Sequence, residues 1–126
     1  MFPSHENTNP DFSGQTERQI KVGLTIRSIA QDFFQRESSG ASLITVTKAD
    51  ISKDLKRANI FITVYPETKE DQALEFAKRM RTDLRTDLKN KLHIRVIPNV
   101  EVKIDQGEKA RQEMDIVFKK VENEKK

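Results

Sequence analysis

Cysteine is absent from this chain of 126 residues, and only four glycines are present. The first absence excludes disulfides, cysteine-ligated zinc and thiol nucleophiles, and it permits a reducing compartment. The few glycines form neither a GxGxxG nor a GxxxxGK motif, which argues against a nucleotide held in a glycine-rich loop. No apolar run approaches the roughly 20 residues that span a bilayer, and the N-terminal segment lacks the basic and apolar regions of a secretory signal. We therefore expect a cytoplasmic protein that does not contact a membrane.

Residue types that carry out acid–base chemistry are also sparse. The two histidines, His5 and His93, are far apart in the sequence, and no cluster of histidine, aspartate and glutamate has metal-ligand spacing. Nothing local suggests a serine, histidine and acid set. Asp50 and Asp54 are spaced like a pair of catalytic carboxylates, but two such residues in a loop are more often simply solvated. We expect a protein that is not an enzyme and that uses no metal, cofactor or small-molecule substrate.

Positive charge is concentrated in one segment. Residues 1–17 contain three acidic residues and no lysine or arginine, whereas residues 78–95 contain seven basic and two acidic residues, a net charge of +5. On a helix, four of these basic side chains fall within an arc of about 80°: Lys78, Arg81, Arg85 and Lys89. Such a row can follow a nucleic-acid backbone, because ammonium and guanidinium groups pair with phosphates and release counterions. The alternative is a solvated helix with internal ion pairs to Asp83 and Asp87.

Apolar residues at helical spacing predict three helices. The first covers residues 16–36, where Ser13 or Thr16 is a suitable cap. The second covers 67–91, with a break predicted near Thr82–Thr86 because threonine and aspartate are poor helix formers. The third follows a turn at 105–107. Their apolar stripes are Val22, Ile26, Ile29 and Phe33; then Ala73, Ala77, Met80, Leu84 and Leu88; then Ala110, Met114, Val117 and Val121.

Alternating apolar residues predict three strands, at 43–47, 59–65 and 92–105. Residues 49–58 between the first two suit a long hairpin connection, and Pro98 predicts a bulge or an edge position in the third. The third strand has to return across the long helix, so we expect an α+β fold whose three-stranded sheet has helices packed on one face. We expect a disordered tail at residues 1–15, a single domain over 16–121 and a frayed end at 122–126.

Phe61 and Tyr65 lie on one face of the second predicted strand, as aromatic residues that stack on nucleic-acid bases do. The alternative, which we favour, is that they cover the sheet or pack under the tail.

Three short motifs resemble those of the ribosome-binding factor A family, in the family's order and over about residues 18–120. An R-V-G-x-x-I element is matched by Lys21-Val22-Gly23-Leu24-Thr25-Ile26. An S-x-D-L-x-x-A element before a strand is matched by Ser52-Lys53-Asp54-Leu55-Lys56-Arg57-Ala58. A strand that opens with R-I/V-x-P and ends in aspartate is matched by Arg95-Val96-Ile97-Pro98 and Asp105.

This resemblance implies a KH-like domain of the type II arrangement that binds the small (30S) ribosomal subunit and its 16S rRNA during late maturation. It also implies a link to rRNA end processing and to growth in the cold. It implies that the protein is not a catalyst and binds no cofactor. The family's Ala-x-Gly kink corresponds to Met80-Arg81-Thr82, and Thr82 or Thr86 is a possible cap for a second helix. Asp54, Leu55 and Ala58 are expected to be structural.

The residues we predict to bind RNA are Lys53, Lys56, Arg57, Lys78, Arg81, Arg85, Lys89 and Arg95. We expect the protein to act as a monomer. Two alternatives stay open: a generic KH-like RNA-binding protein outside the ribosome, and a protein-interaction module.

Overall fold

The computed structural model describes residues 14–38 and 40–124. The elements along the chain are α1 (Glu17–Glu37), β1 (Leu43–Ile51), β2 (Arg57–Tyr65), the 3-10 helix η3 (Glu67–Lys69), α2 (Glu70–Arg79), α3 (Arg81–Lys91), β3 (Asn99–Ile104) and α4 (Gln106–Glu124). Most of the predicted tail, residues 1–13, lies outside the described residues, as do 125–126.

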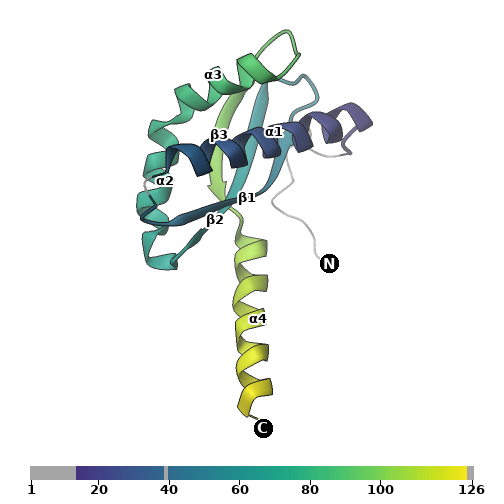
Figure 1. Ribbon diagram of the computed structural model, residues 1–126. Coiled ribbons are helices and arrows are strands. Elements are labelled where there is room, and N and C mark those ends of the chain that lie inside the picture. The colour runs from purple at the N-terminus through teal and green to yellow at the C-terminus, as the bar shows by residue number, and fades with distance from the viewer. Residues whose placement is uncertain (1–13, 39, 125–126) are drawn as a thin grey trace.

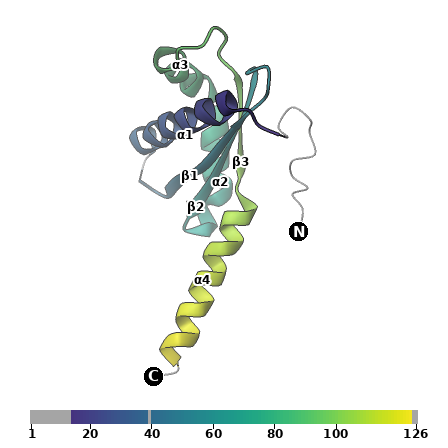
Figure 2. The same ribbon diagram turned by 90° about the vertical axis from the view of Figure 1, so that its right-hand side faces the viewer.

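The three strands form one sheet in the order β1-β2-β3, in which β2 pairs antiparallel with β1 and parallel with β3. Helices α1, α2 and α3 cover one face of this sheet, and α4 leaves the sheet at the end of β3 (Figures 1 and 2). Val46 pairs with Ile62, and Ile60 pairs with Val102, so their side chains share the helix-covered face. The predicted α+β architecture is therefore confirmed. We call α1–α3 and the sheet the body.

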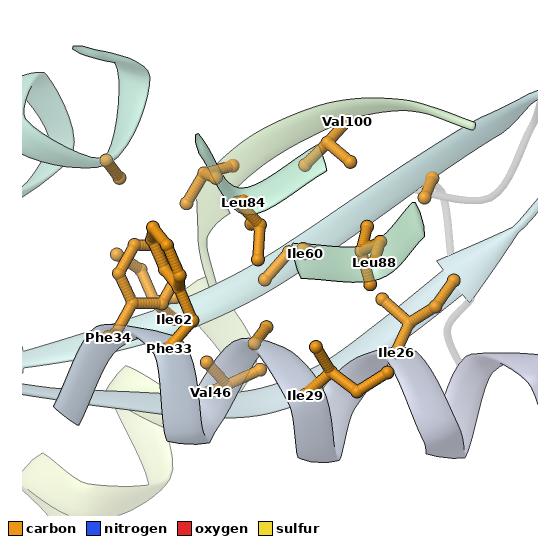
Figure 3. Packing of buried hydrophobic residues seen from close by; sticks show 14 of the residues in the cluster. Ile26, Ile29, Phe33, Phe34, Val46, Ile60, Ile62, Leu84, Leu88 and Val100 are labelled. Atoms are coloured by element: carbon orange, nitrogen blue, oxygen red, sulfur yellow. The ribbon is translucent and has the colours of Figure 1, made fainter. Parts of the chain in front are cut away.

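One hydrophobic core fills the space between the sheet and the three helices of the body (Figure 3). Helix α1 supplies much of it, because Ile26, Ile29 and Phe33 of the predicted stripe are buried. The helix begins with a capping box in which the Thr16 hydroxyl accepts from the Gln19 N–H and the Gln19 side chain accepts from the Thr16 N–H. Thr16 is thus the cap, and Ser13, the other residue considered, lies outside the described residues.

Gly23 lets α1 approach β1 closely. A Cβ atom at this position would lie 2.6 Å from the carbonyl oxygen of Ala49, a distance that only glycine avoids. The glycine of the Lys21-Val22-Gly23 element is thus explained by packing.

The connection between β1 and β2 is shorter than predicted, because the two strands extend into residues 49–58 and leave only 52–56 as a loop. The strands pair as far as Ile51 and Ala58, past a bulge between Val46 and Lys48. Of the polar residues that suggested a loop, four are exposed and Ser52 is buried. The exposed ones are Lys53, Asp54, Lys56 and Arg57. Leu55 in this turn has φ 61°, an uncommon left-handed conformation for leucine.

The predicted helix at 67–91 does break, at the first residue of the Met80-Arg81-Thr82 element that the resemblance marks as the kink, and not within Thr82–Thr86. Met80 has φ −86° and ψ 3°, and it separates α2 from α3. Thr82 and Thr86 lie inside α3, where the Thr86 hydroxyl donates to the carbonyl of Thr82 and neither side chain caps the helix. The apolar stripe crosses the break, since Ala77 and Leu84 are both fully buried.

Residues 92–98 form a connection and not the first half of a strand, which corrects the prediction for 92–105. Strand β3 begins only at Asn99, after Pro98. Proline has no N–H to contribute to a ladder, and here both Leu92 and Pro98 are buried at the ends of the connection. The alternation of Leu92, Ile94 and Val96 therefore does not come from strand pairing.

Helix α4 forms as predicted, but its apolar stripe is not covered by the body. Met114 is 54% exposed and Val117 is 52% exposed. The helix includes residues 122–124 of the segment that we expected to be frayed. Among the described residues, no helix is both long and apolar enough to cross a membrane.

Candidate nucleic-acid interface

Seven of the eight predicted RNA-binding residues are exposed, and the eighth, Arg85, is half-buried. They come from the loop at 52–56, the start of β2, the α2–α3 segment and the connection 92–98. Two shallow pockets gather five of them, whereas Lys53, Lys56 and Lys78 line neither pocket.

The first hollow, the junction pocket, has a volume of about 360 Å³ and lies where the start of α3 meets β2 and β3. Its lining residues are Arg57, Ala58, Asn59, Arg81, Asn99, Val100, Glu101 and Lys103. It brings Arg57 and Arg81 together although they are distant in the sequence. It also adds Lys103, which sequence reasoning missed. The alternation of β3, which buries Val100 and Val102 and exposes Glu101 and Lys103, could have placed Lys103 there.

The second hollow, the α3 pocket, has a volume of about 470 Å³ and lies between α3 and the connection 92–98. Its lining residues are Thr82, Arg85, Thr86, Lys89, Arg95, Val96 and Ile97. None of these described lining residues is acidic. The pocket therefore joins Lys89 on the helix with Arg95 on the connection in a positively charged surface.

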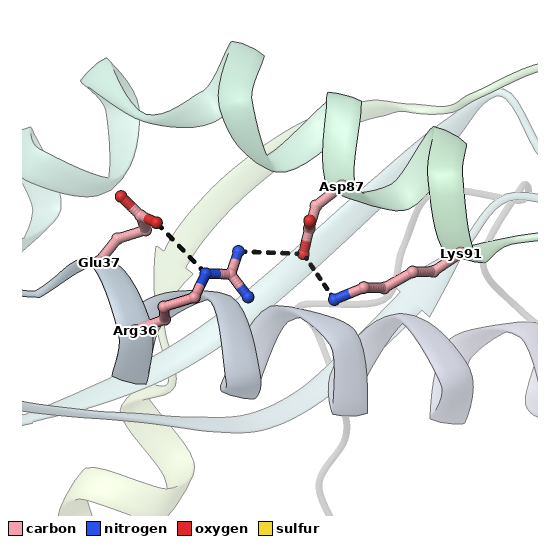
Figure 4. Close-up of polar contacts among 4 residues, drawn as sticks. All are labelled: Arg36, Glu37, Asp87 and Lys91. Atoms are coloured by element: carbon pink, nitrogen blue, oxygen red, sulfur yellow. Dashed lines mark hydrogen bonds and ion pairs between the residues drawn. The ribbon is translucent and has the colours of Figure 1, made fainter.

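The main acidic side chain of α3 is turned away from this pocket. Asp87 Oδ2 lies 3.4 Å from Arg36 Nη2 on α1 and 3.2 Å from Lys91 Nζ (Figure 4). Hydrogen bonds from the Arg36 guanidinium to Glu37 and to Asp87 raise the pKa of Arg36. Lys91 is thus the internally paired cation of α3.

Lys53 and Lys56 in the turn make no ion pair with any described residue. On α2, α3 and the connection 92–98, four more predicted cations make neither an ion pair nor a side-chain hydrogen bond with any described residue: Lys78, Arg81, Lys89 and Arg95. Ion pairing inside α3, the alternative that the sequence left open, accounts for Lys91 and not for these four. Unpaired cations beside concave surfaces are suited to binding polyanions.

The turn at 52–56 is held by Asp54. Its Oδ1 accepts from the Ser52 hydroxyl at 2.6 Å and from the Lys56 N–H at 3.0 Å. These hydrogen bonds lower the pKa of Asp54, and the one from Ser52 has the larger effect. The Lys56 carbonyl in turn accepts from the Asn99 N–H at 2.8 Å, which fastens the turn to the start of β3. The structural roles predicted for Asp54, Leu55 and Ala58 agree with this arrangement and with the packing of both apolar residues against the core.

The two acidic residues considered as a catalytic pair have separate partners. The Asp54 carboxylate holds the turn, and Asp50 Oδ1 accepts from the Gln15 side chain at 3.5 Å. Within 14–38 and 40–124, no group of three or more histidine or acidic side chains is placed to hold a metal ion.

The aromatic residues of β2 differ from each other. Lys48 Nζ lies 4.7 Å from the centre of the Phe61 ring, so the lysine covers this ring with a cation–π contact. Tyr65 is 74% exposed and lines a small pocket of about 260 Å³ together with Leu43 and Ile116. The expectation that these aromatic residues pack on the sheet therefore fits Phe61 but not the exposed Tyr65.

Comparisons with known proteins agree with this fold. A family model described as ribosome-binding factor A matches residues 18–118. The ribosome-binding factor A of Flavobacterium johnsoniae is 32% identical over 97 residues, which cover 72% of this chain and 75% of that protein. That of Bradyrhizobium sp. is 26% identical over 110 residues, covering 83% of this chain and 80% of that protein.

Solved structures are similar as well. The crystal structure of ribosome-binding factor A from Thermus thermophilus superposes with a TM-score of 0.63 at 20% identity, covering 68% of this chain and 94% of that one. A homology model of the Thermus thermophilus factor, fitted into the cryo-electron-microscopy map of a 30S complex, gives a TM-score of 0.57 at 21% identity, covering 64% of this chain and 88% of that one. These likenesses show the KH-like fold that the resemblance predicted.

Proposed function

The chain belongs to the ribosome-binding factor A family, and from this membership we propose that it binds the small ribosomal subunit and its 16S rRNA as an assembly factor. It acts in the cytoplasm as a monomer, during late maturation and rRNA end processing, and supports growth in the cold. The observation that carries the RNA-binding part is a set of unpaired cations, Lys78, Arg81, Lys89 and Arg95, of which the last three line the two pockets.

These cations bind RNA through phosphates. Each phosphate that is neutralised releases counterions, so the logarithm of the binding constant falls with the logarithm of the salt concentration by about 0.7–0.9 per contact. Such contacts carry no base information. Specificity comes from the shape of the folded rRNA, with the cations on α3 and the connection 92–98 fixing the orientation of the body.

The proposal is tested by binding to purified small subunits over a series of KCl concentrations. Reversing the charge at two sites, Arg81→Glu with Lys89→Glu, is expected to weaken binding on the order of 100-fold at low salt and to flatten the salt dependence. The matched control is Lys119→Glu with Lys120→Glu, which changes the net charge equally on the exposed surface of α4. Wild-type binding that is absent, or that does not respond to salt, contradicts the proposal.

A protein-interaction module is the second candidate, favoured by the exposure of Tyr65 beside Ile116 of α4. It predicts a protein partner that is retained after the reversal at Arg81 and Lys89. A generic KH-like RNA-binding protein instead predicts that free single-stranded RNA binds as well as the small subunit does. Sedimentation of cell extract separates these outcomes, because an assembly factor co-migrates with free small subunits and not with translating ribosomes.

A further inference from the structure

Arg85 differs from the other predicted RNA-binding residues because the fold already uses its side chain. Its Nε donates to the carbonyl of Pro98 at 3.1 Å, and its Nη2 donates to the carbonyl of Ile97 at 3.3 Å. The guanidinium is planar and presents its donors as a rigid fork, so it can hold two consecutive carbonyls at once. Arg85 therefore joins the outer side of α3 to the end of the connection 92–98.

The connection depends on this contact for its shape. Leu92 anchors its first end, where its N–H donates to the carbonyl of Leu88 at 2.7 Å, and buried Pro98 anchors its last. Between these anchors residues 92–98 belong to no helix or strand. The Arg85 fork fixes the carbonyls at 97 and 98, directly after the segment that carries Arg95 into the α3 pocket.

The lining of the α3 pocket offers positive charge and hydrogen-bond donors to a phosphate group. Lys89 stands on the helix side and Arg95 on the connection side, and both are exposed and without an ion pair among the described residues. The Thr82 hydroxyl adds a neutral donor, whereas the Thr86 hydroxyl already donates to the Thr82 carbonyl at 3.2 Å. No acidic side chain among the lining residues competes for the two cations.

We propose that the α3 pocket is a binding site for one phosphodiester of RNA, in which Lys89, Arg95 and Thr82 contact the phosphate and Arg85 is a positioning residue that shapes the site. This assignment rests on the proposed function for its ligand. It divides the basic residues of α3 into those that contact RNA and one that holds the connection in place.

The test uses the full chain and two probes, inorganic phosphate and purified small subunits. Phosphate is titrated into the protein while backbone amide resonances are followed by NMR. The expected result is a saturable shift confined to α3 and residues 92–98, lost in the variant Lys89→Ala with Arg95→Ala. The control variant Lys119→Ala with Lys120→Ala makes the same change in net charge on α4 and is expected to keep the shift.

With small subunits, Lys89→Ala with Arg95→Ala is expected to weaken binding roughly tenfold and to lower the salt slope by about 0.7–0.9, the value for one phosphate. Arg85→Lys keeps the charge but cannot hold both carbonyls, and it is expected to weaken binding to a similar extent. If Arg85 acts through the pocket, adding Arg85→Lys to the double variant causes no further loss. Circular dichroism verifies the fold of each variant.

Each outcome decides one part. Unchanged phosphate shifts and subunit binding in Lys89→Ala with Arg95→Ala overturn the pocket, and if Arg81→Glu still weakens binding the proposed function stands. Full binding by Arg85→Lys, or losses that multiply in the triple variant, overturn the positioning role. A wild-type protein that shows the phosphate shifts but ignores small subunits overturns the proposed function and keeps the anion site.

Discussion

Helices α1 and α4 carry the same apolar spacing, yet only one of them is packed. In α1 the residues at this spacing, Ile26 and Phe33 among them, are buried against the sheet. In α4 the equivalent residues, such as Met114 and Val117, stand about half exposed in a helix that projects from the body (Figure 1). The spacing predicts that a helix forms and which side is apolar. It does not predict what covers that side.

The difference arises from how each helix is attached. Helix α1 lies along β1, where Gly23 permits close approach and the Gln31 side chain accepts from the Val46 N–H at 2.7 Å. The polar contacts between α4 and the rest of the described chain lie near the start of the helix, although Gln112, Glu113 and Ile116 also line a pocket with β1 and β2. Asp105 Oδ1 accepts from the Glu108 N–H at 3.0 Å, and Lys109 Nζ lies 3.1 Å from Glu70 Oε2. These contacts set the direction of α4 and leave its apolar residues uncovered.

The largest expected effect compares one phenylalanine from each region. Phe34→Ala removes a fully buried ring from the core and is expected to lower the free energy of unfolding by about 3–5 kcal/mol. Phe118→Ala removes a ring that is 62% exposed and is expected to change it by less than about 0.5 kcal/mol. Urea denaturation of both variants measures the contrast. Similar losses would show that α4 is packed in solution.

Replacing one glycine in each helix by alanine is expected to change the stability in opposite directions. Gly23→Ala in α1 places a Cβ atom 2.6 Å from the Ala49 carbonyl oxygen, so the helix must shift, at a cost of about 1–3 kcal/mol. Gly107→Ala in α4 meets only the Asp105 side chain at 3.7 Å, and alanine favours the helix by up to about 1 kcal/mol. Thermal unfolding should show a lower midpoint for the first variant and an equal or higher one for the second. A stable Gly23→Ala variant contradicts the close approach.

Asp105 links the body to α4, and its replacement tests whether the two unfold together. Asp105→Ala removes the cap of α4 and the partner of the Thr47 hydroxyl on β1. A lost cap costs about 1 kcal/mol. We expect faster amide hydrogen exchange throughout α4 and little change in α1. Glu113→Ala, on the exposed middle of α4, is the control. Equal acceleration in both helices after Asp105→Ala would mean that the body and α4 unfold as one unit.

The sequence predicted the elements whose pattern is local and missed those that depend on tertiary contacts. The helices, the three strands and the open side of the sheet follow from periodicity and capping. Helix propensity placed the break too late, near Thr82–Thr86, whereas the family resemblance placed it at Met80-Arg81-Thr82, where the structure has it. The alternation at 92–98 was misleading, because only Leu92 and Pro98 at its ends are buried, Val96 is exposed, and the segment belongs to no strand.

The candidate site was predictable in composition but not in arrangement. Charge counting found Arg81, Lys89 and Arg95, which make no ion pair among the described residues. It also selected Arg85, whose donors face backbone carbonyls that no sequence pattern marks. Lys103 was missed because its neighbours in the sequence are not basic, although it lines the junction pocket together with Arg57.

The smallest expected effect is on the pH dependence of stability, and it is tested with one carboxylate from the body and one from α4. Hydrogen bonds lower the pKa of Asp54 in the body, chiefly from Ser52, and the pKa of Glu108 on α4, chiefly from Arg111. A lowered pKa in the folded state contributes stability that is present above the unfolded pKa and lost as the pH falls through the folded pKa. Asp54→Asn is therefore expected to flatten the acid side of the stability profile, below about pH 4. Glu108 lies on the helix that projects from the body (Figure 1), so we expect Glu108→Gln to leave that profile unchanged. Denaturation at a series of pH values tests both variants.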